Sequence, residues 1–337
     1  MNSIGIDAHS ARFFLCAVND RGNLIKSLDR EMSPENLIEA VGSVPGPRQV
    51  TVEESHLAQF VKSVLEVHAD RLIVCDPRHN RWIAEADFCD DRTAARKLAL
   101  LLHRDELKEV VHPDNVQAEL RSTFMHYHDL NAAIVRCKNK VKGVFRSVGI
   151  RAPGRRVYGS ARREWLDKLR SWRHLLVEVR QHYEVLDVLL KQKVATCRLM
   201  VRLAAREPAF ALLRTIPGVG PVLAAGYVAL IGSAHRFSHK NKLWSYAGFG
   251  NVLHTSDART YKSGCSSNGN RVLKWVVLQH FRHVVRIKKS NYLNRKYKQM
   301  LASGHSETAS RRATCRLLLS VVRRMWIDSR EYREEGL

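Results

Sequence analysis

The sequence predicts an α/β domain at the N-terminus, a helical coiled-coil connector, and a mostly α-helical domain at the C-terminus. Three observations predict this division. Short apolar runs bounded by turn residues dominate the first 110 residues, helical periodicity follows from about residue 115, and the charge changes sign between these two parts. We therefore expect domains at 1–113, 114–208 and 209–337.

Charge is distributed very unevenly along the 337 residues, whose net charge is +23. Residues 1–110 hold 14 basic and 18 acidic side chains, whereas residues 111–337 hold 42 basic and 15 acidic ones. This pattern favours an acid-bearing, metal-binding domain joined to a domain that binds a polyphosphate. A basic structural protein with an ordinary acidic domain is the alternative that charge alone leaves open.

Composition excludes several classes of protein. Apolar residues form 45% of the chain, enough for a sizeable core, and no apolar run approaches the roughly 18 residues of a membrane span. The seven cysteines are scattered and form no CxxC pair, which argues against a disulfide framework or a zinc site. No signal peptide is recognised at Met1. We expect a cytoplasmic protein with no membrane partner.

Five strands and three helices are expected in the N-terminal domain. The expected strands are 3–8, 12–18, 24–28, 49–53 and 71–75, and the expected helices are 34–44, 56–68 and 90–103. The first helix has Ser33 before it and Pro34 at its first position, a favourable helix start. A three-stranded meander followed by strand–helix–strand units is typical of the ribonuclease H-like, or RuvC-like, architecture.

The rest of the chain predicts helices. Residues 115–148 predict one long basic amphipathic helix, and 161–206 predict a second long helical stretch. Apolar spacings of three and four in the second stretch indicate a helical hairpin or coiled-coil arm. Residues 210–330 predict a compact helical domain that ends in a basic amphipathic helix. The six tryptophans of the chain lie mostly at helical apolar positions and are expected in the core rather than as surfaces for base stacking: Trp82, Trp165, Trp172, Trp244, Trp275 and Trp326.

Carboxylates stand where elements of the N-terminal domain end or begin. Asp7 closes the first strand, Glu53 or its neighbour Glu54 closes the fourth, and Asp90 and Asp91 begin the last helix. The first and fourth strands of a ribonuclease H-like sheet are neighbours, so Asp7 and Glu53 should lie close together. Two-metal phosphodiester chemistry needs several converging carboxylates. One such acid alone is most simply a solvated strand end, but together they favour a metal site.

Three segments resemble the DEDD-type transposases of insertion sequences, the IS110 family, and their Piv-like invertase relatives. Ile4–His9 resembles the GID opening of the family, Thr51–Glu54 resembles its glutamate strand, and Asp91–Ala99 resembles its D-x-x-D-A-R-x-L-A helix. The resemblance continues into the C-terminal domain and so covers nearly the whole chain.

The resemblance implies a Mg²⁺ site made by Asp7, Glu53 and Asp91. Ala94 stands where the family has its fourth acid. Asp90 lies four residues before Ala94, on nearly the same helix face, and is our candidate to replace that acid as a metal ligand.

Glycines in the C-terminal domain indicate a phosphate-binding turn. Gly218 and Gly220, with proline on both sides, predict a tight turn that leads into a helix N-terminus with free backbone N–H groups. Such a helix-hairpin-helix turn grips phosphate without reading sequence. An ordinary turn between helices is the alternative. The same stretch resembles the family's L-x-x-I-P-G-[IV]-G motif.

The resemblance also supplies a nucleophile. Tyr246–Phe249 and Gly269–Lys274 resemble two further family motifs, and counting back from Gly269 places Ser256 on the family's nucleophilic serine. Asp257 replaces the glycine that usually follows it. By chemistry alone, Ser256 is an ordinary residue of a polar loop. The nearby cations that would cradle phosphates are Arg259, Lys262, Arg271 and Lys274.

These features imply a DNA transposase or site-specific recombinase that cuts and rejoins donor and target DNA. Ser256 would form a covalent link to a DNA phosphate, and Mg²⁺ held by the acids would act as a Lewis acid. The resemblance further implies a homodimer or homotetramer and a noncoding guide ("bridge") RNA, and the basic segments 132–156 and 282–298 suit either polyanion. The alternatives are a RuvC-like metal-dependent nuclease that uses water, and a catalytically decayed nucleic-acid-binding protein, which Ala94 and Asp257 support.

Overall fold

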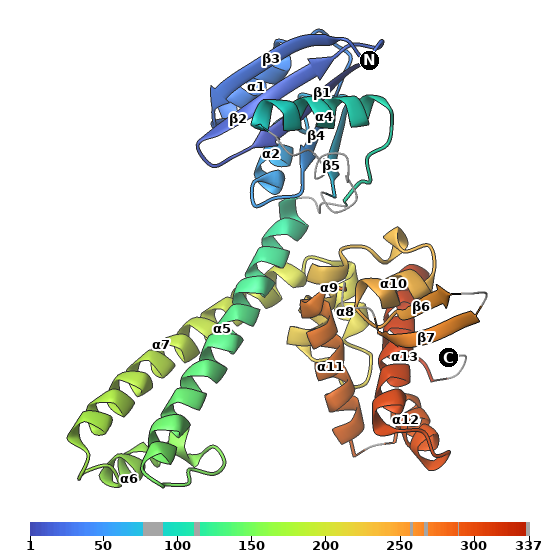
Figure 1. Ribbon diagram of the computed structural model, residues 1–337. Coiled ribbons are helices and arrows are strands. Elements are labelled where there is room, and N and C mark those ends of the chain that lie inside the picture. The colour runs from blue at the N-terminus through green and yellow to red at the C-terminus, as the bar shows by residue number, and fades with distance from the viewer. Residues whose placement is uncertain (77–89, 111–114, 257–258, 266–268, 289, 335–337) are drawn as a thin grey trace. The chain divides into compact units, whose positions relative to one another are not determined.

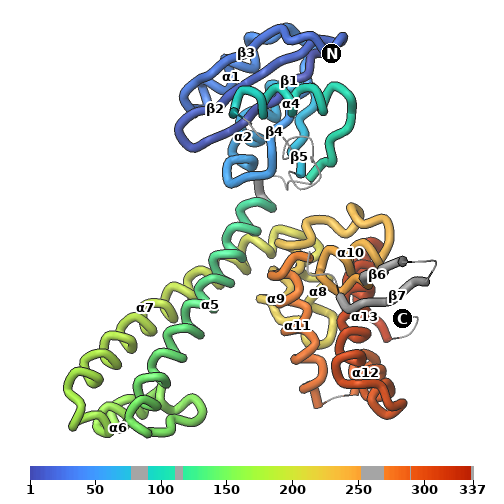
Figure 2. Tube along the Cα trace, in the orientation of Figure 1, coloured from blue at the N-terminus to red at the C-terminus, as the bar shows by residue number. Residues whose placement is uncertain are grey.

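The computed structural model describes residues 1–76, 90–110, 115–256, 259–265, 269–288 and 290–334. It divides into two compact units, Met1–Asn115 and Val116–Leu337, which we describe separately (Figures 1 and 2). Among the described helices, none combines the length and the apolar composition that a membrane span requires.

The N-terminal unit is built on a mixed five-stranded sheet with the strand order β3-β2-β1-β4-β5. The strands are β1 (Asn2–Ala8), β2 (Arg12–Val18), β3 (Leu24–Glu31), β4 (Arg48–Glu53) and β5 (Arg71–Cys75). The central strand β1 pairs antiparallel with β2 and parallel with β4, which places Ile6 opposite Val52. The prediction that the first and fourth strands are neighbours is confirmed.

Helices cover both faces of this sheet. They are α1 (Pro34–Gly42), α2 (Ala58–Leu65) and α4 (Asp91–His103). Ile4 and Ile6 of β1 join the buried residues of α1 and α2 in one apolar core. The residue between them, Gly5, faces α4, because successive residues of a strand point to opposite faces. The helix α4 therefore lies on the other face, against β1 and β2.

Gly5 sets the distance between β1 and α4. A Cβ atom built on Gly5 would overlap the backbone oxygen of Ala95 and the backbone nitrogen of Ala99. Any larger residue would push α4 away from the strand. Since Asp91 is the first residue of α4 and Asp7 is the next-to-last residue of β1, this close packing also fixes how near the two carboxylates come.

The C-terminal unit is mostly helical, as predicted. Its elements are α5 (Asn115–Ser147), η2 (Arg156–Tyr158), α6 (Arg162–Asp167), α7 (Arg173–Ala204), α8 (Pro208–Leu213), α9 (Pro221–Ile231), η3 (Ala234–Arg236), α10 (Lys240–Tyr246), β6 (Asn251–Ser256), β7 (Arg259–Cys265), α11 (Arg271–Arg286), α12 (Tyr292–Ala302) and α13 (Glu307–Asp328). The long helix predicted over 115–148 is confirmed.

The second long stretch differs from its prediction, because residues 168–172 divide it into α6 and α7. Trp165 and Leu169 turn into a small core that they share with Phe145 of α5, and this inward turn interrupts the helix. Farther along, Ile134 and Cys137 of α5 pack against α7, so the two long helices lie side by side (Figure 1).

The main core of this unit surrounds α9, which is buried at every position from Leu223 to Ile231. Gly226 lets the Phe124 ring of α5 approach, since a Cβ atom there would lie 2.7 Å from two ring carbons. The described part of the unit also holds a hairpin, β6–β7, in a segment for which the sequence predicted a polar loop. The β-branched and aromatic residues Val252, Thr255, Thr260 and Tyr261 favour strand geometry there.

Candidate active site

Three side chains converge at the carboxyl end of β1. His9 Nε2 lies 3.5 Å from Asp7 Oδ2 and 3.6 Å from Asp91 Oδ1. One ligand atom from each of the three residues lies within 4.8 Å of the others. The Asp7 side chain is 20% exposed and that of Asp91 is 49% exposed, so the cluster opens to solvent on one side. Two carboxylates and one imidazole in this arrangement could hold a divalent cation.

Each member of the cluster comes from a different local structure. Asp7 is the next-to-last residue of the buried strand β1, and the backbone N–H of His9 donates to Arg12 O in the turn between β1 and β2. Asp91 begins α4, where the positive end of the helix dipole favours a carboxylate. The structure therefore brings together Asp7 and Asp91, which the sequence analysis expected to meet.

Glu53 lies beside this cluster, at the end of the neighbouring strand β4. Asp7, His9 and Glu53 line one pocket of about 450 Å³, whose other lining residues are Ala8, Ser10, Val52, Ser55, His56 and Leu57. Burial raises the pKa of Glu53, and the charge of Asp7 raises it further. The adjacent Glu54 is exposed and lies outside this lining.

The electrostatics of the cluster suit a bound cation. Burial raises the pKa of Asp7, the His9 ring lowers it, and the charge of Asp91 raises it. Desolvation and mutual repulsion therefore destabilise the ionised forms of these carboxylates. A divalent cation would offset both effects, and carboxylate oxygens are the ligands that hard cations such as Mg²⁺ prefer.

Asp90 serves as the N-cap of α4. Its Oδ1 accepts a hydrogen bond of 2.7 Å from the backbone N–H of Thr93. Hydrogen bonding by the Thr93 side chain, and then by this backbone N–H, lowers the pKa of Asp90. The cluster of Asp7, His9 and Asp91 does not include it. That Asp90 replaces the acid missing at Ala94 remains a prediction.

His9 is the member of the cluster that the sequence analysis did not assign. It lies inside the GID-like segment, two residues after Asp7, but no second histidine accompanies it at a metal-binding spacing. Its position could have indicated this role, because a residue that closely follows an acid at the end of a strand lies at the same edge of the sheet.

The turn before α9 packs against α11. Gly218 has a φ of +85°, and a Cβ atom on it would lie 3.1 Å from Val284 Cγ2. His280 Nε2 donates to Pro217 O at 3.0 Å, and His283 Nδ1 donates to Gly218 O at 3.3 Å. Gly220, the N-cap of α9, is exposed. The two histidines thus hold the turn through its carbonyl groups, and the start of α9 at Gly220 stays exposed.

The segments that resemble the C-terminal family motifs meet at the base of the β6–β7 hairpin. Gly269 packs directly against Gly248, and the backbone N–H of Asn270 donates to Tyr246 O at 2.7 Å. Ser256 ends β6 and is paired with Arg259, the first residue of β7. The side chains of Ser256, Arg259 and Lys262 lie outside the described part of the structure.

Two further candidate cations lie at the start of α11. Arg271 is its first residue and is exposed, whereas Lys274 Nζ lies 5.6 Å from the centre of the Phe249 ring. Lys274 therefore packs against the same loop that contains Gly248.

Comparison with known families gives two matches. Residues 4–150 match a DEDD-type family model described as a transposase, and residues 210–298 match the model of the transposase IS116/IS110/IS902 family. Together the two matches cover more than half of the chain. No curated protein matches the sequence.

Proposed function

The chain belongs to the IS110 family of transposases, and we propose that it cuts and rejoins DNA through Ser256, assisted by Mg²⁺ at Asp7, Glu53 and Asp91. Membership of the family makes the protein an enzyme that binds DNA, cleaves it and transfers strands with the help of a divalent metal. The observation that carries the metal part of the proposal is the convergence of Asp7, His9 and Asp91 beside Glu53.

The acids would hold the cation, with Asp90 as the further candidate ligand. When bound, Mg²⁺ would stabilise the negative charge that develops on the phosphate oxygens. The protein's part is to fix the ligands: the sheet sets Asp7 beside Glu53, and the contact at Gly5 sets Asp91 beside Asp7. His9 contacts both aspartates and would orient them.

Ser256 would act as the nucleophile. Its hydroxyl loses a proton as the Oγ–phosphorus bond forms, and the deoxyribose oxygen leaves and takes up a proton. The resulting phosphoserine link conserves the energy of the phosphodiester bond for religation. The support is the spacing of Ser256 from the motif at Gly269 and its position at the end of β6. Phosphate contacts would come from Arg259, Lys262, Arg271 and Lys274, and from the turn at Gly218 and Gly220.

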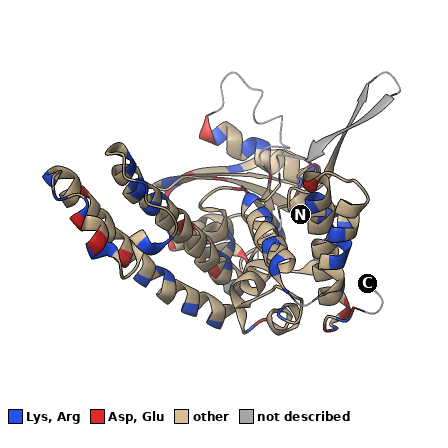
Figure 3. Ribbon diagram, turned by 90° about the horizontal axis from the view of Figure 1, so that it is seen from below, with Lys and Arg blue, Asp and Glu red and all other residues tan. Residues whose placement is uncertain are grey.

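A guide RNA is the second polyanion that we propose. The segment 132–156 holds eight Lys and Arg residues and no acid, and Figure 3 shows cations along the long helices. Lys142, Arg146 and Arg151 line a pocket of about 320 Å³. The pKa of Lys138 is lowered by burial and by the nearby cations Lys193 and Arg155. Such crowding of cations is relieved by a bound phosphate backbone.

We further propose that the protein is a homodimer or homotetramer. Five apolar side chains of α7 are more than 40% exposed, and four of them share one face of the helix, Val177, Val185, Val188 and Leu199, whereas Val194 lies outside it. Spacings of 8, 3 and 11 residues keep these four within about 80° of one another around the helix. An exposed apolar stripe on a long helix favours packing against another copy of that helix.

A cleavage assay tests the proposal. The protein would be incubated with Mg²⁺, its co-purified RNA and labelled DNA that spans the ends of the element, and analysed on a denaturing gel. We expect a covalent protein–DNA band that Asp7→Ala and Ser256→Ala each abolish. The matched controls Asp20→Ala and Ser160→Ala change exposed residues outside the candidate sites and should keep the band.

The other outcomes identify the alternatives. Free cut ends without a covalent band, unaffected by Ser256→Ala, would replace the proposal with a hydrolytic nuclease. Salt-sensitive binding to DNA and RNA without any strand breakage would indicate a decayed copy, and would make Ala94 and Asp257 the first residues to restore to Asp and Gly.

A further inference from the structure

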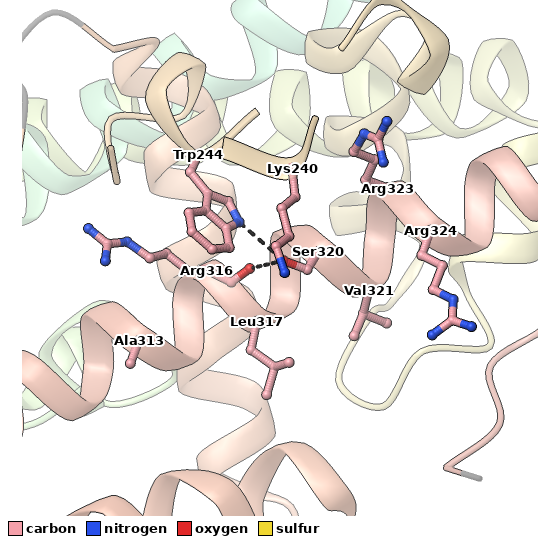
Figure 4. Close-up of a pocket in the computed structure, with 9 residues that line it drawn as sticks. All are labelled: Lys240, Trp244, Ala313, Arg316, Leu317, Ser320, Val321, Arg323 and Arg324. Atoms are coloured by element: carbon pink, nitrogen blue, oxygen red, sulfur yellow. Dashed lines mark hydrogen bonds between the residues drawn. The ribbon is translucent and has the colours of Figure 1, made fainter. Parts of the chain in front are cut away.

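A second pocket lies in the C-terminal unit, between α10 and α13, and has a volume of about 570 Å³ (Figure 4). It is lined by Lys240, Trp244, Ala313, Arg316, Leu317, Ser320, Val321, Arg323 and Arg324. Four of these nine residues are cations and none is an acid. The other large contributors are apolar or aromatic, so the pocket combines an apolar surface with a strongly positive one.

Trp244 is held rigidly in this pocket. Its indole Nε1 donates to Ser320 Oγ at 3.2 Å, and that hydroxyl donates to Arg316 O at 2.9 Å. As the sequence predicted, Trp244 packs against the main core of this unit, but it is only half-buried, and Figure 4 shows it beside Lys240 at the pocket. Lys240 Nζ lies 5.8 Å from the centre of its ring. The Arg316 guanidinium lies 5.5 Å from the same centre, so the structure presents an aromatic surface fixed beside two cations.

Most of the positive charge of the pocket is not balanced by carboxylates within the described part of the chain. Arg316 Nε donates to Phe249 O at 2.7 Å, and Arg323 Nη2 donates to Phe237 O at 2.7 Å. Backbone carbonyl groups orient a guanidinium but do not neutralise it. Arg324 Nε lies 3.5 Å from Asp328 Oδ2, and within the described part of the chain the other three cations form no ion pair with a carboxylate. The pocket therefore remains complementary to an anion.

We propose that this pocket binds one unpaired nucleotide of a nucleic-acid strand, with its base against Trp244 and its phosphates toward the cations. The proposal rests on the proposed function, because it names a part of the nucleic acid that the enzyme handles. A base offers a flat π-face to the indole and a nucleotide offers negative charge to the rim. An acidic peptide would satisfy the cations and leave the aromatic surface uncovered. In a duplex, neighbouring bases cover both faces, so the base must be unstacked.

The pocket is connected to the strand that ends at Ser256. Besides Phe249 O, Arg316 also donates through Nη2 to the side-chain oxygen of Asn251, the first residue of β6. One arginine therefore touches both the nucleotide pocket and the base of the hairpin. A nucleotide held at Trp244 would fix a strand with respect to this hairpin.

Binding of labelled single strands by the full-length protein tests the inference. The probes are a ten-nucleotide DNA strand, an RNA strand of the same sequence, and a DNA strand of the same length in which one central base is absent. We expect the intact strand to bind about 10-fold more tightly than the abasic one, within the range of base–aromatic stacking. Trp244→Leu should reduce the binding of the intact strand to that of the abasic strand, and Trp244→Phe should restore most of it.

Control variants separate the stacking of the base on Trp244 from the attraction between phosphates and cations. Trp172→Leu removes an exposed tryptophan outside the pocket and should leave the 10-fold ratio unchanged. Lys240→Ala should weaken both strands equally and lower the salt slope by about 0.7. Comparison of the DNA and RNA probes shows which strand the pocket prefers. Asp7→Ala should leave the ratio intact, because Asp7 is not among the residues that line this pocket.

Three results would overturn the inference. The first is equal binding of intact and abasic strands by the native protein. The second is a ratio that Trp244→Leu leaves unchanged while circular dichroism shows a folded variant. The third is stronger competition by polyglutamate than by single-stranded DNA, which would assign the pocket to an acidic protein segment. If DNA cleavage still depends on Asp7 and Ser256 in any of these cases, the proposed function stands and only the nucleotide pocket fails.

Discussion

The two units differ in how far their functional charged groups are buried. In the N-terminal unit, Asp7 and Glu53 stand at the ends of buried strands, where burial raises the pKa of each carboxyl. In the C-terminal unit, backbone carbonyls orient two of the four cations of the pocket at Trp244, Arg316 and Arg323, and all four are half-buried or exposed. The acids are therefore costly to keep ionised without a bound cation, whereas the cations are stable as they are and ready for a polyanion. In our proposal, the N-terminal unit holds a cation and the C-terminal unit holds a nucleic-acid strand.

The largest test of this contrast is Asp7→Asn. We expect the loss of a metal ligand to lower the rate of strand cleavage on the order of 10³-fold. The same change removes a partly buried charge that Asp91 repels, so the metal-free protein should become more stable by roughly 0.5–1 kcal/mol. Cleavage assays and urea unfolding measure the two effects. A variant that loses both activity and stability would show that Asp7 is a structural residue.

The acids of the N-terminal unit were predictable for a definite physical reason. Each ends or begins an element of clear periodicity, and a parallel neighbour fixes the register, so Asp7 and Glu53 had to meet once β1 and β4 were adjacent. His9 was missed because no metal-ligand spacing marks it. The close approach of α4 to Gly5 was also missed, because that contact joins residues about 90 positions apart in the sequence.

The C-terminal unit was less predictable, because its features are assembled from distant segments. The turn at Gly218 is held by His280 and His283, more than 60 residues away. The pocket joins Trp244 to Ser320 across 76 residues, and nothing local distinguishes this tryptophan from a core residue. The β6–β7 hairpin was expected as a loop because its apolar residues do not alternate clearly.

A buried histidine gives the C-terminal unit its own dependence on pH. The His280 ring is neutral near pH 7, with Nε2 donating to Pro217 O and Nδ1 therefore left to accept from the Tyr227 hydroxyl. Burial lowers the pKa of His280 from 6.5 to about 4. Because the unfolded chain binds the proton first as the pH falls, stability should decrease between pH 6.5 and 4 and level off below.

The total decrease from His280 should be on the order of 3 kcal/mol. Hydrogen exchange of peptides from α9 and α11, measured across this pH range, would follow it. His280→Gln should be less stable at pH 7 but should lose most of the pH dependence. An unchanged profile in this variant would assign the effect to other groups.

A pair of glycine substitutions compares the packing of the two units. Gly5→Ala should destabilise the N-terminal unit by about 2 kcal/mol, because the new Cβ atom overlaps the backbone of α4. Gly143→Ala in α5 meets no heavy atom within 4 Å and should stabilise the C-terminal unit by about 0.5–1 kcal/mol. Hydrogen exchange resolved by peptide separates the two units. A neutral Gly5→Ala would show that α4 shifts easily, and then Asp91 would not be held firmly beside Asp7.

The smallest expected effect decides the role of Asp90. Asp90→Ala removes the N-cap of α4 and should cost about 1 kcal/mol of stability, whereas Asp90→Asn keeps an oxygen that accepts from the Thr93 N–H and should cost almost nothing. If capping is its only role, Asp90→Asn should also retain cleavage, since an amide caps the helix as the carboxylate does. Cleavage that falls in Asp90→Asn while stability is kept would instead make Asp90 the ligand that replaces the acid missing at Ala94. The same neutral substitution thus separates a residue that holds the helix from one that holds the ion.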